Sequence, residues 1–217
     1  FGELEESWKD ILDQVKPDAM FVNEDYSPFS IERDKCLKRL CEERGIKFHS
    51  LHDYMLLDKS DVVLANGQFY TQYTPFYMKA SKKKVPRPDS YEPKNFILGD
   101  IEFKNEFKGN IHDFYTPVPE LEIHGGRTRG LEVLDNIKNF KDYSKMRIYP
   151  SVGTTKISPH AKYGTLSIRE IYWAIADNLG KSHELMRQLF WRDFYYNITY
   201  HHPHTVFDAF IPQFKGI

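Results

Sequence analysis

The first 51 residues show two rounds of the same hydrophobic pattern. Apolar side chains recur every three or four positions in residues 4–15 and again in residues 31–41, which predicts two amphipathic helices. The short apolar run 19–22 follows the first helix and predicts a buried strand, and residues 46–51 after the second helix are predicted to be the next strand. The order helix, strand, helix, strand is typical of an α/β layer, so we expect the two strands to be parallel.

The chain then carries one turn signal and loses its regular pattern between residue 82 and about residue 126. Asn66-Gly67 lies between the apolar stretches 62–64 and 69–70 and favours the tight turn of a hairpin. From residue 82 onward a run of lysines and several prolines replace the periodic positions, which predicts a long connector on the surface. The lysine run is more typical of a solvated surface than of a DNA site.

Helical periodicity returns after the glycine pair at 125–126. The apolar positions of the first helix there form one stripe that we expect to be buried: Leu131, Leu134 and Ile137. Farther along, Ser167 and Glu170 have the spacing of a capping box, which predicts the start of a second helix. The second half of the chain is therefore expected to be helical.

A longer helix is predicted after Ser182, its expected N-cap. One face carries Met186, Phe190 and Phe194 and is predicted to lie in the core. The other face combines an amide, an indole, a guanidinium and a phenol: Gln188, Trp191, Arg192 and Tyr195. Aromatic rings can stack on a nucleobase, and arginine can pair with a phosphate. An ordinary half-buried helix with wet polar tips would carry the same residue types, so both interpretations stay open.

A hydroxyl-rich run precedes these helices. Its members are Thr154, Thr155, Lys156, Ile157 and Ser158. Hydroxyls, backbone N–H groups and a lysine on a turn ahead of a helix can hold a diphosphate. The same residue types also cap helices, so the run alone fits either an anion site or a cap.

Composition narrows the class of protein. With 217 residues, 41% hydrophobic and 15% aromatic, the chain can bury a core and form one or two domains. No apolar run approaches the roughly 20 residues of a membrane span, and no signal peptide opens the chain, so we expect an intracellular protein, cytoplasmic or nuclear, with no membrane partner. Cys36 and Cys41 fit neither a redox motif nor a zinc set and are expected to be reduced thiols.

The net charge and the histidines by themselves say little about which ligand the chain binds. The net charge is −1, but residues 141–204 carry nine Lys and Arg against five Asp and Glu, which is compatible with a phosphate-binding face. His201, His202 and His204 lie close together, yet a proline interrupts them and no cysteine or carboxylate stands at ligand spacing. We therefore predict no metal site and expect a loop near DNA.

Taken together and in order, several blocks resemble the DNA photolyase and cryptochrome family of flavoproteins. The blocks are residues 22–29, 73–77, 143–150, 153–158, 162–170 and 191–195. The resemblance is to a class I-like deoxyribodipyrimidine photolyase. It implies a fragment that covers the second half of the antenna domain and the first half of the FAD-binding domain.

The resemblance also implies a fold and a domain plan. The fold class is α/β: a partial Rossmann-like antenna domain with a parallel sheet, residues 1–81, then a connector, residues 82–126, then a partial all-helical FAD-binding domain, residues 127–217. Phe29 and Ser30 stand where folate-binding members of the family carry an Asn-Glu pair. A second, antenna chromophore is therefore expected without a chemical identity.

Site residues follow from the same resemblance. The FAD contacts would be Tyr143, Thr154, Thr155, Lys156, Ile157 and Ser158. The contacts to UV-damaged DNA would be Arg147, Gln188, Leu189, Phe190, Trp191, Arg192, Asp193, Phe194 and Tyr195. Gln188 and Trp191 would be the catalytic pair, with Trp191 stacking against the lesion, and Arg192 would reach towards phosphate.

The implied activity is that of a carbon-carbon lyase. Reduced FAD would pass an electron to a cyclobutane pyrimidine dimer, and the dimer would split. Gln188 stands where dimer photolyases usually have a glutamate, and glutamine is more typical of (6-4) photolyases and animal-type cryptochromes, so a (6-4) photolyase or a cryptochrome-like photoreceptor is the alternative. The family's later FAD-binding segment is not in these 217 residues. We therefore expect weak FAD binding, a second polypeptide that completes the site, or a non-catalytic remnant.

Overall fold

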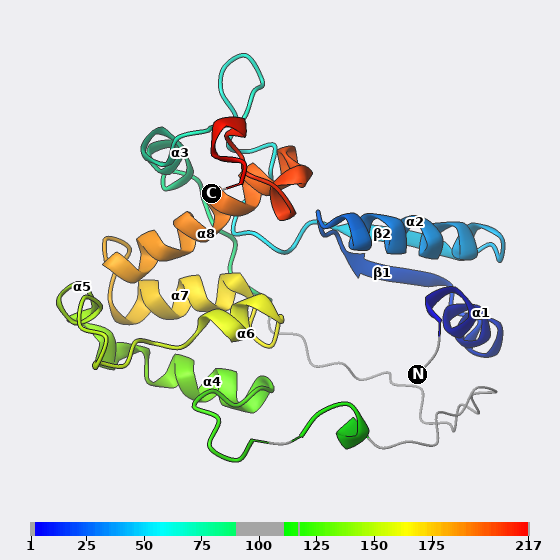
Figure 1. Ribbon diagram of the computed structural model, residues 1–217, viewed down its shortest axis with the longest axis horizontal. Coiled ribbons are helices and arrows are strands. Elements are labelled where there is room, and N and C mark those ends of the chain that lie inside the picture. Colours follow the sequence, from blue (N-terminus) through cyan, green and yellow to red (C-terminus); the bar gives the residue numbers. More distant parts are fainter. Residues whose placement is uncertain (1–2, 90–110, 117, 217) are drawn as a thin grey trace. The chain divides into compact units, whose positions relative to one another are not determined.

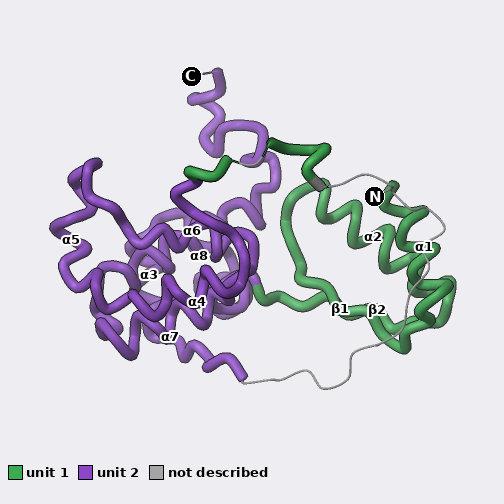
Figure 2. The backbone as a smooth tube through the Cα atoms, turned by 90° about the horizontal axis from the view of Figure 1, so that it is seen from below, with its two compact units in different colours: residues 1–53, 90–120 green, residues 54–89, 121–217 purple. Residues whose placement is uncertain are grey.

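The computed structural model describes residues 3–89, 111–116 and 118–216. It forms two compact units, residues 1–53 with 90–120 and residues 54–89 with 121–217 (Figure 2). The boundaries of these units differ from the expected domain boundaries at residues 81 and 126, because residues 54–89 pack with the helical unit. Residues 90–110 of the predicted connector lie outside the described residues. The domain plan implied by the family resemblance stays a prediction.

The first unit is an α/β layer. Its elements are α1 (Leu4–Val15), β1 (Ala19–Asn23), α2 (Pro28–Glu42) and β2 (Lys47–Leu51), as Figure 1 shows. β1 and β2 are parallel, with Ala19 paired to Lys47 at one end. The predicted order of elements and the parallel pairing are therefore confirmed.

The core of this unit lies between the two helices and the sheet. Leu12, Leu40, Cys41 and Ile46 are buried together. Burial raises the pKa of the Cys41 thiol, which is a free cysteine. The prediction that residues 19–22 form a buried strand is wrong as to burial, because no residue of β1 is fully buried and Phe21 is 65% exposed. Among the described residues the sheet has two strands only.

The second unit is helical. Its helices are α3 (Tyr73–Ala80), α4 (Arg127–Asp135), α5 (Tyr143–Met146), α6 (Ser158–Lys162), α7 (Ile168–Asn178) and α8 (Glu184–His201). Short 3₁₀ turns occupy Ile137–Phe140, Pro203–Val206 and Pro212–Phe214. α8 contacts α3, α5 and α7, so it is the central helix of the unit. No helix in the described part of the chain is long and apolar enough to cross a membrane.

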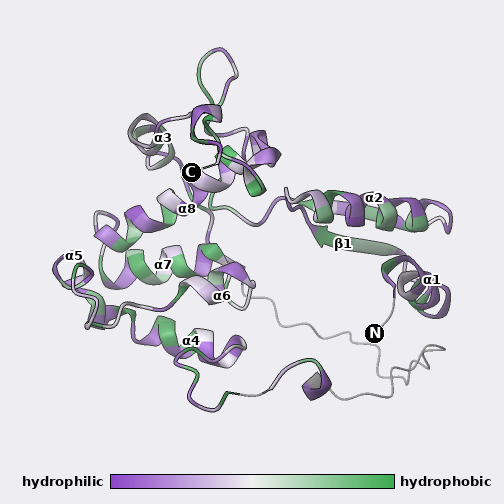
Figure 3. Ribbon diagram, in the orientation of Figure 1, coloured by the Kyte–Doolittle hydropathy of each residue, from purple (hydrophilic) through white to green (hydrophobic). Residues whose placement is uncertain are grey.

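The apolar face predicted for α8 is confirmed. Met186, Phe190 and Phe194 are buried in the main core. Hydrophobic and hydrophilic residues alternate in bands around the helices of the unit (Figure 3). Packing of these bands against α3 and α7 removes apolar area from water, which is the main stabilising contribution to such a fold.

The structure contains two features that short sequence motifs predicted, a capping box and a tight turn. Ser167 caps α7 and Glu170 accepts a bond from the Ser167 backbone N–H at 2.8 Å, which confirms the capping box. The predicted turn at Asn66-Gly67 is present, with Gly67 at φ +80°. It closes a single antiparallel bridge between Val63 and Phe69 rather than two extended strands.

Two other local predictions need correction. His183, not Ser182, is the N-cap of α8, and its Nδ1 accepts the N–H of Leu185 at 3.3 Å. Leu131 of α4 is 40% exposed, whereas Gly130 is the buried residue of that helix. Leu134 packs against the main core, and Ile137, in the 3₁₀ turn that follows α4, is buried in it, so the predicted stripe is confirmed at two of its three positions.

Gly130 gives the first testable prediction, because α4 approaches the core closely there. A Cβ atom at this position would lie 2.8 Å from Cγ of Leu166, a side chain in the core. An alanine normally stabilises a helix interior by about 1 kcal/mol relative to glycine. Here we expect Gly130→Ala to lower the free energy of unfolding by about 1 kcal/mol, because overpacking outweighs that gain. Urea denaturation measures it.

Gly125→Ala is the matched control for this variant. A Cβ at Gly125 meets no atom within 4 Å, so its free energy of unfolding should stay within about 0.5 kcal/mol of the wild type. A Gly130→Ala protein more stable than the wild type would contradict the close contact.

Candidate functional site

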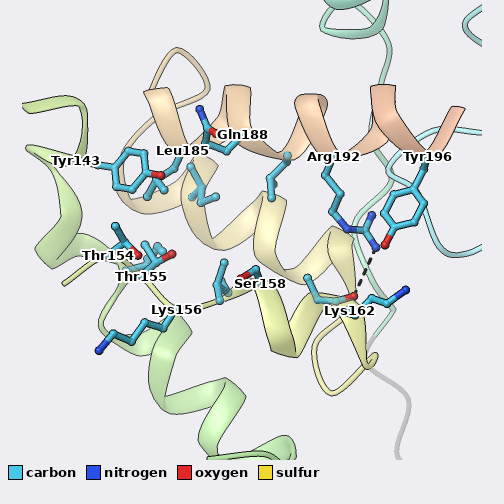
Figure 4. A pocket seen from close by; sticks show the side chains of 15 residues that line it. Tyr143, Thr154, Thr155, Lys156, Ser158, Lys162, Leu185, Gln188, Arg192 and Tyr196 are labelled. Atoms are coloured by element: carbon cyan, nitrogen blue, oxygen red, sulfur yellow. Dashed lines mark hydrogen bonds between the residues drawn. The ribbon is translucent and has the colours of Figure 1, made fainter. Parts of the chain in front are cut away.

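The hydroxyl-rich run, α5 and α8 enclose a cavity of about 430 Å³, the loop pocket (Figure 4). All six residues predicted to contact a cofactor line it: Tyr143, Thr154, Thr155, Lys156, Ile157 and Ser158. The other walls come from Ile137, Ala161, Lys162, Ile175, Leu185, Gln188, Leu189, Arg192 and Tyr196. A contiguous loop and one long helix therefore face each other across a single space.

The hydroxyls of the loop do not serve as helix caps. The N-cap of α6 is Ile157, which makes no side-chain capping bond, so the capping interpretation is wrong. Within the residues that the structure describes, the hydroxyls of Thr154 and Ser158 have no hydrogen-bonding partner. Figure 4 shows both of them across the pocket from Gln188 and Arg192. They are free to donate to, or accept from, a ligand.

Lys156 has an unusual backbone for a side-chain-bearing residue. Its φ is +53°, a left-handed conformation that is uncommon outside glycine and is often found at functional sites. The stem of the side chain lines the loop pocket, while its ammonium group is paired with the Glu122 carboxylate. In Figure 4 the amine points away from the hydroxyls. The loop thus offers hydroxyls and backbone to the pocket, with the lysine charge at its edge.

Arg192 supplies positive charge at the opposite wall. Its guanidinium donates to the carbonyl oxygen of Tyr54 at 2.7 Å. It also donates to the carbonyl oxygen of Ala161 at 3.4 Å, and the dashed line in Figure 4 marks this second bond. It also lies over the rings of Tyr54 and Tyr196, with distances of 4.8 and 4.4 Å to the centroids. The side chain is only 17% exposed. Arg192 is therefore a fixed charge on the loop pocket, suited to an anionic group.

A second, more open cavity of about 460 Å³ lies beside the same helix. It is called the aromatic pocket here and is lined by Arg147, Glu184, Arg187, Gln188, Trp191 and Tyr195. Gln188 lines both pockets, so its amide stands where they adjoin. The structure thus brings together four residues of the predicted DNA contact.

Stacked aromatic rings form the floor of the aromatic pocket. The Trp191 indole stacks on Tyr73, with ring centroids 3.5 Å apart and planes 7° from parallel. Tyr195 stacks more loosely on Trp191, at 5.7 Å, and is 61% exposed. Such rings can hold a base by stacking.

Acidic and basic groups surround Gln188. Its Nε2 donates to Oε1 of Glu184 at 3.1 Å. The same carboxylate lies 3.4 Å from the guanidinium of Arg147 and 3.7 Å from that of Arg187. The pocket therefore combines two guanidiniums, one carboxylate and one amide around an aromatic floor.

Comparisons with known proteins show which proteins this chain resembles. The family model described as DNA photolyase matches residues 2–94. The deoxyribodipyrimidine photo-lyase of Alkalihalophilus pseudofirmus is 26% identical over 202 residues, which cover 86% of this chain and 41% of that protein. The crystal structure of an archaeal photolyase from Sulfolobus tokodaii with two FAD molecules is 33% identical, covers all of this chain and has a TM-score of 0.76.

This chain belongs to the DNA photolyase and cryptochrome family. It spans 46% of the Sulfolobus chain and 41% of the Alkalihalophilus protein. A (6-4)DNA photolyase of Oryza sativa is also similar, with 27% identity over 222 residues. The small parallel sheet and the helices match part of the photolyase fold.

Four residues of the predicted DNA contact need correction in this photolyase-family chain. Leu189, Phe190, Asp193 and Phe194 are all buried. Their side chains pack inside the helical unit and cannot touch DNA directly. Asp193 instead accepts the backbone N–H of Leu56 at 2.8 Å, and burial raises its pKa to about 7.

Arg192 is also displaced from its predicted role. The structure places its guanidinium in the loop pocket, bound to two carbonyl groups, and not among the residues of the aromatic pocket. Conversely, Glu184 and Arg187 line the aromatic pocket although they were not predicted. Glu184 could have been found from its spacing to Gln188, because residues four apart are neighbours on a helix surface.

Proposed function

We propose that the loop pocket holds FAD and that the aromatic pocket receives a UV-damaged pyrimidine pair from DNA. The observation that supports this most directly is the pair of adjoining cavities that share Gln188, the first of them lined by every residue expected to contact FAD. The protein would then take part in light-dependent DNA repair as a carbon-carbon lyase. Bound and reduced FAD supplies the electron that splits the dimer.

The lining of the loop pocket suits a flavin dinucleotide. Its hydroxyls and the Arg192 guanidinium provide hydrogen bonds and charge for a diphosphate, while Tyr143, Ile175 and Leu185 provide apolar surface for a ring system. The volume of about 430 Å³ lies within the roughly 300–1,000 Å³ of ligand sites. Because the chain spans 46% of the Sulfolobus photolyase and 41% of the Alkalihalophilus protein, we propose that these 217 residues alone bind FAD weakly and that a further segment or a second polypeptide completes the site.

The aromatic pocket would hold two adjacent pyrimidines of one strand, flipped out of the duplex. Trp191 and Tyr195 would stack on it, and Arg147 and Arg187 would bind the flanking phosphates. Gln188, between the two pockets, would hydrogen-bond the base beside the flavin. A glutamine can accept and donate hydrogen bonds but cannot give up a proton at neutral pH, so its role is to hold and orient.

Gln188 also supports a second candidate function. A neutral amide at this position is typical of (6-4) photolyases and of cryptochrome-like photoreceptors. Both a (6-4)DNA photolyase and the Drosophila melanogaster protein cryptochrome-1 are similar to this chain. Light-driven repair of oligonucleotides that hold one kind of lesion separates these functions. Repair of cyclobutane dimers supports the first proposal, repair of (6-4) lesions the second, and repair of neither favours a photoreceptor or a remnant.

The test of flavin binding uses Thr155, which is buried in the wall of the loop pocket. We expect Thr155→Val, which removes the hydroxyl and keeps the shape, to weaken FAD binding about three- to tenfold, the value of one hydrogen bond. Flavin fluorescence during titration with FAD measures this.

Thr74→Val, at an exposed position of α3, is the matched control and should bind FAD as the wild type does. The proposal fails if FAD does not bind saturably at all. It also fails in its choice of pocket if both valine variants bind FAD equally well.

A further inference from the structure

We infer that Glu184 is a positioning residue: it fixes the side-chain amide of Gln188 so that the carbonyl oxygen is the group offered to a base in the aromatic pocket. The pocket would then prefer pyrimidines with an imide N–H, as thymine and uracil have. This inference rests on the proposed function and adds to it a residue and a substrate preference.

The first step is the bond between the two side chains. Nε2 of Gln188 lies 3.1 Å from Oε1 of Glu184, one helical turn away. An ionised carboxylate can only accept hydrogen bonds, so it must face the NH₂ end of the amide. The reverse orientation would set two acceptor oxygens against each other and leave no bond. Glu184 therefore selects one of the two orientations of the amide.

The second step is that Glu184 is itself held in place. Arg147, at the end of α5, and Arg187, on α8, lie 3.4 and 3.7 Å from its carboxylate. The Glu184 side chain is only 21% exposed, so its charge is partly shielded from solvent. Two guanidiniums from different elements thus balance and anchor the carboxylate that holds Gln188.

The third step concerns the base. Oε1 of Gln188 is left to accept a hydrogen bond, in a pocket whose other walls are Trp191 and Tyr195. An enzyme that receives a flipped base reads it through hydrogen bonds to its Watson–Crick edge. The N3 atom of thymine and uracil carries a hydrogen and can donate to this oxygen. The N3 atom of cytosine is an acceptor and would meet another acceptor.

The experiment compares two DNA duplexes that differ in one group. One carries a single thymine dimer, and the other carries the same dimer methylated at N3 of both bases, so that it cannot donate. We expect the wild-type chain to bind the first about tenfold more tightly than the second. In Glu184→Gln the ratio should fall to about threefold, because a neutral amide can pair with either end of Gln188.

The ratio is the readout because Glu184→Gln also removes a negative charge and should raise the affinity for both duplexes. Glu32→Gln removes an exposed carboxylate from α2 and should leave both ratio and affinities unchanged. An unchanged ratio in Glu184→Gln would overturn the inference.

A cycle with Gln188→Leu tests whether Glu184 acts through Gln188. In the Gln188→Leu background, Glu184→Gln should have no further effect on the ratio, since the amide that it positions is gone. A further drop in that background would mean that Glu184 acts on the DNA directly, which also overturns the inference.

A measurement without DNA separates this inference from the proposed function. The side-chain NH₂ resonance of Gln188, assigned by its loss in Gln188→Leu, should shift in Glu184→Gln because its acceptor changes from a carboxylate to an amide. No shift would overturn the pairing even if damaged DNA binds. A shift in a chain that does not prefer damaged DNA would leave the pairing in place and overturn the base preference together with the proposed function.

Discussion

Replacing Asp193 with alanine is expected to lower the free energy of unfolding of the helical unit by about 3 kcal/mol. The carboxylate is 2% exposed and accepts the backbone N–H of Leu56 at 2.8 Å. The backbone of Leu57 also hydrogen-bonds to it, and the Arg192 guanidinium lies 3.6 Å away. Alanine would leave these donors buried without an acceptor. Urea denaturation followed by circular dichroism measures the loss.

The variant Asp193→Asn keeps one acceptor oxygen and therefore separates hydrogen bonding from charge. At neutral pH we expect this variant to lose only about 1 kcal/mol. A loss in Asp193→Ala as small as that in Asp193→Asn would contradict the assignment of Asp193 as the acceptor that holds residues 56 and 57 against α8.

The same carboxyl group should make stability depend on pH. Burial raises its pKa from 3.8 to about 7, so between these values the folded chain holds a proton that the unfolded chain has released. The contribution of Asp193 to stability therefore falls as pH rises from about 4 to about 7. Relative to Asp193→Asn, the wild type should be more stable at pH 4.5 than at pH 7.5, by up to about 3 kcal/mol. Parallel pH profiles of the two proteins would contradict this.

Asp193 also shows where sequence reasoning fails. Its partner, Leu56, is 137 positions away in the chain. No local pattern tells whether an aspartate on a helix faces solvent or holds a distant loop, because its burial depends on which segment packs against it. The same holds for Gly130, whose burial against Leu166 is set by tertiary packing and not by the leucine stripe beside it.

The elements that the sequence predicts well are those determined locally. The hydrophobic spacing along the first 51 residues changes from helical to strand-like twice, which predicts the elements from α1 to β2. The capping box marks the start of α7. The loop pocket could be predicted as a group because five of its residues are contiguous. Four of the six residues of the aromatic pocket were grouped through the family resemblance, but the pairing of Arg147 with Glu184 has no local signal, because it joins two separate helices.

Replacing Trp191 with alanine is the other change with a large expected effect. The indole stacks on Tyr73 of α3 at 3.5 Å and meets Phe194 of its own helix edge-on at 5.8 Å, so its loss removes packing between α3 and α8 and within α8. We expect the free energy of unfolding to fall by about 3 kcal/mol. Where the variant remains folded, its preference for UV-irradiated over unirradiated oligonucleotide should be lost, because stacking of a base on an aromatic ring contributes about 1–3 kcal/mol.

Two further variants separate packing from base stacking. Tyr73→Leu removes the stacking partner beneath the indole but leaves the indole in the aromatic pocket, so it should lower stability and keep the preference for damaged DNA. Trp191→Phe keeps a smaller ring and should retain part of the stability and part of the preference for damaged DNA. If Trp191→Ala, still folded, preferred irradiated DNA as strongly as Tyr73→Leu does, the role of Trp191 would be confined to holding α8 against α3. The lesion would then have to be bound by Tyr195 and the charged residues of the pocket.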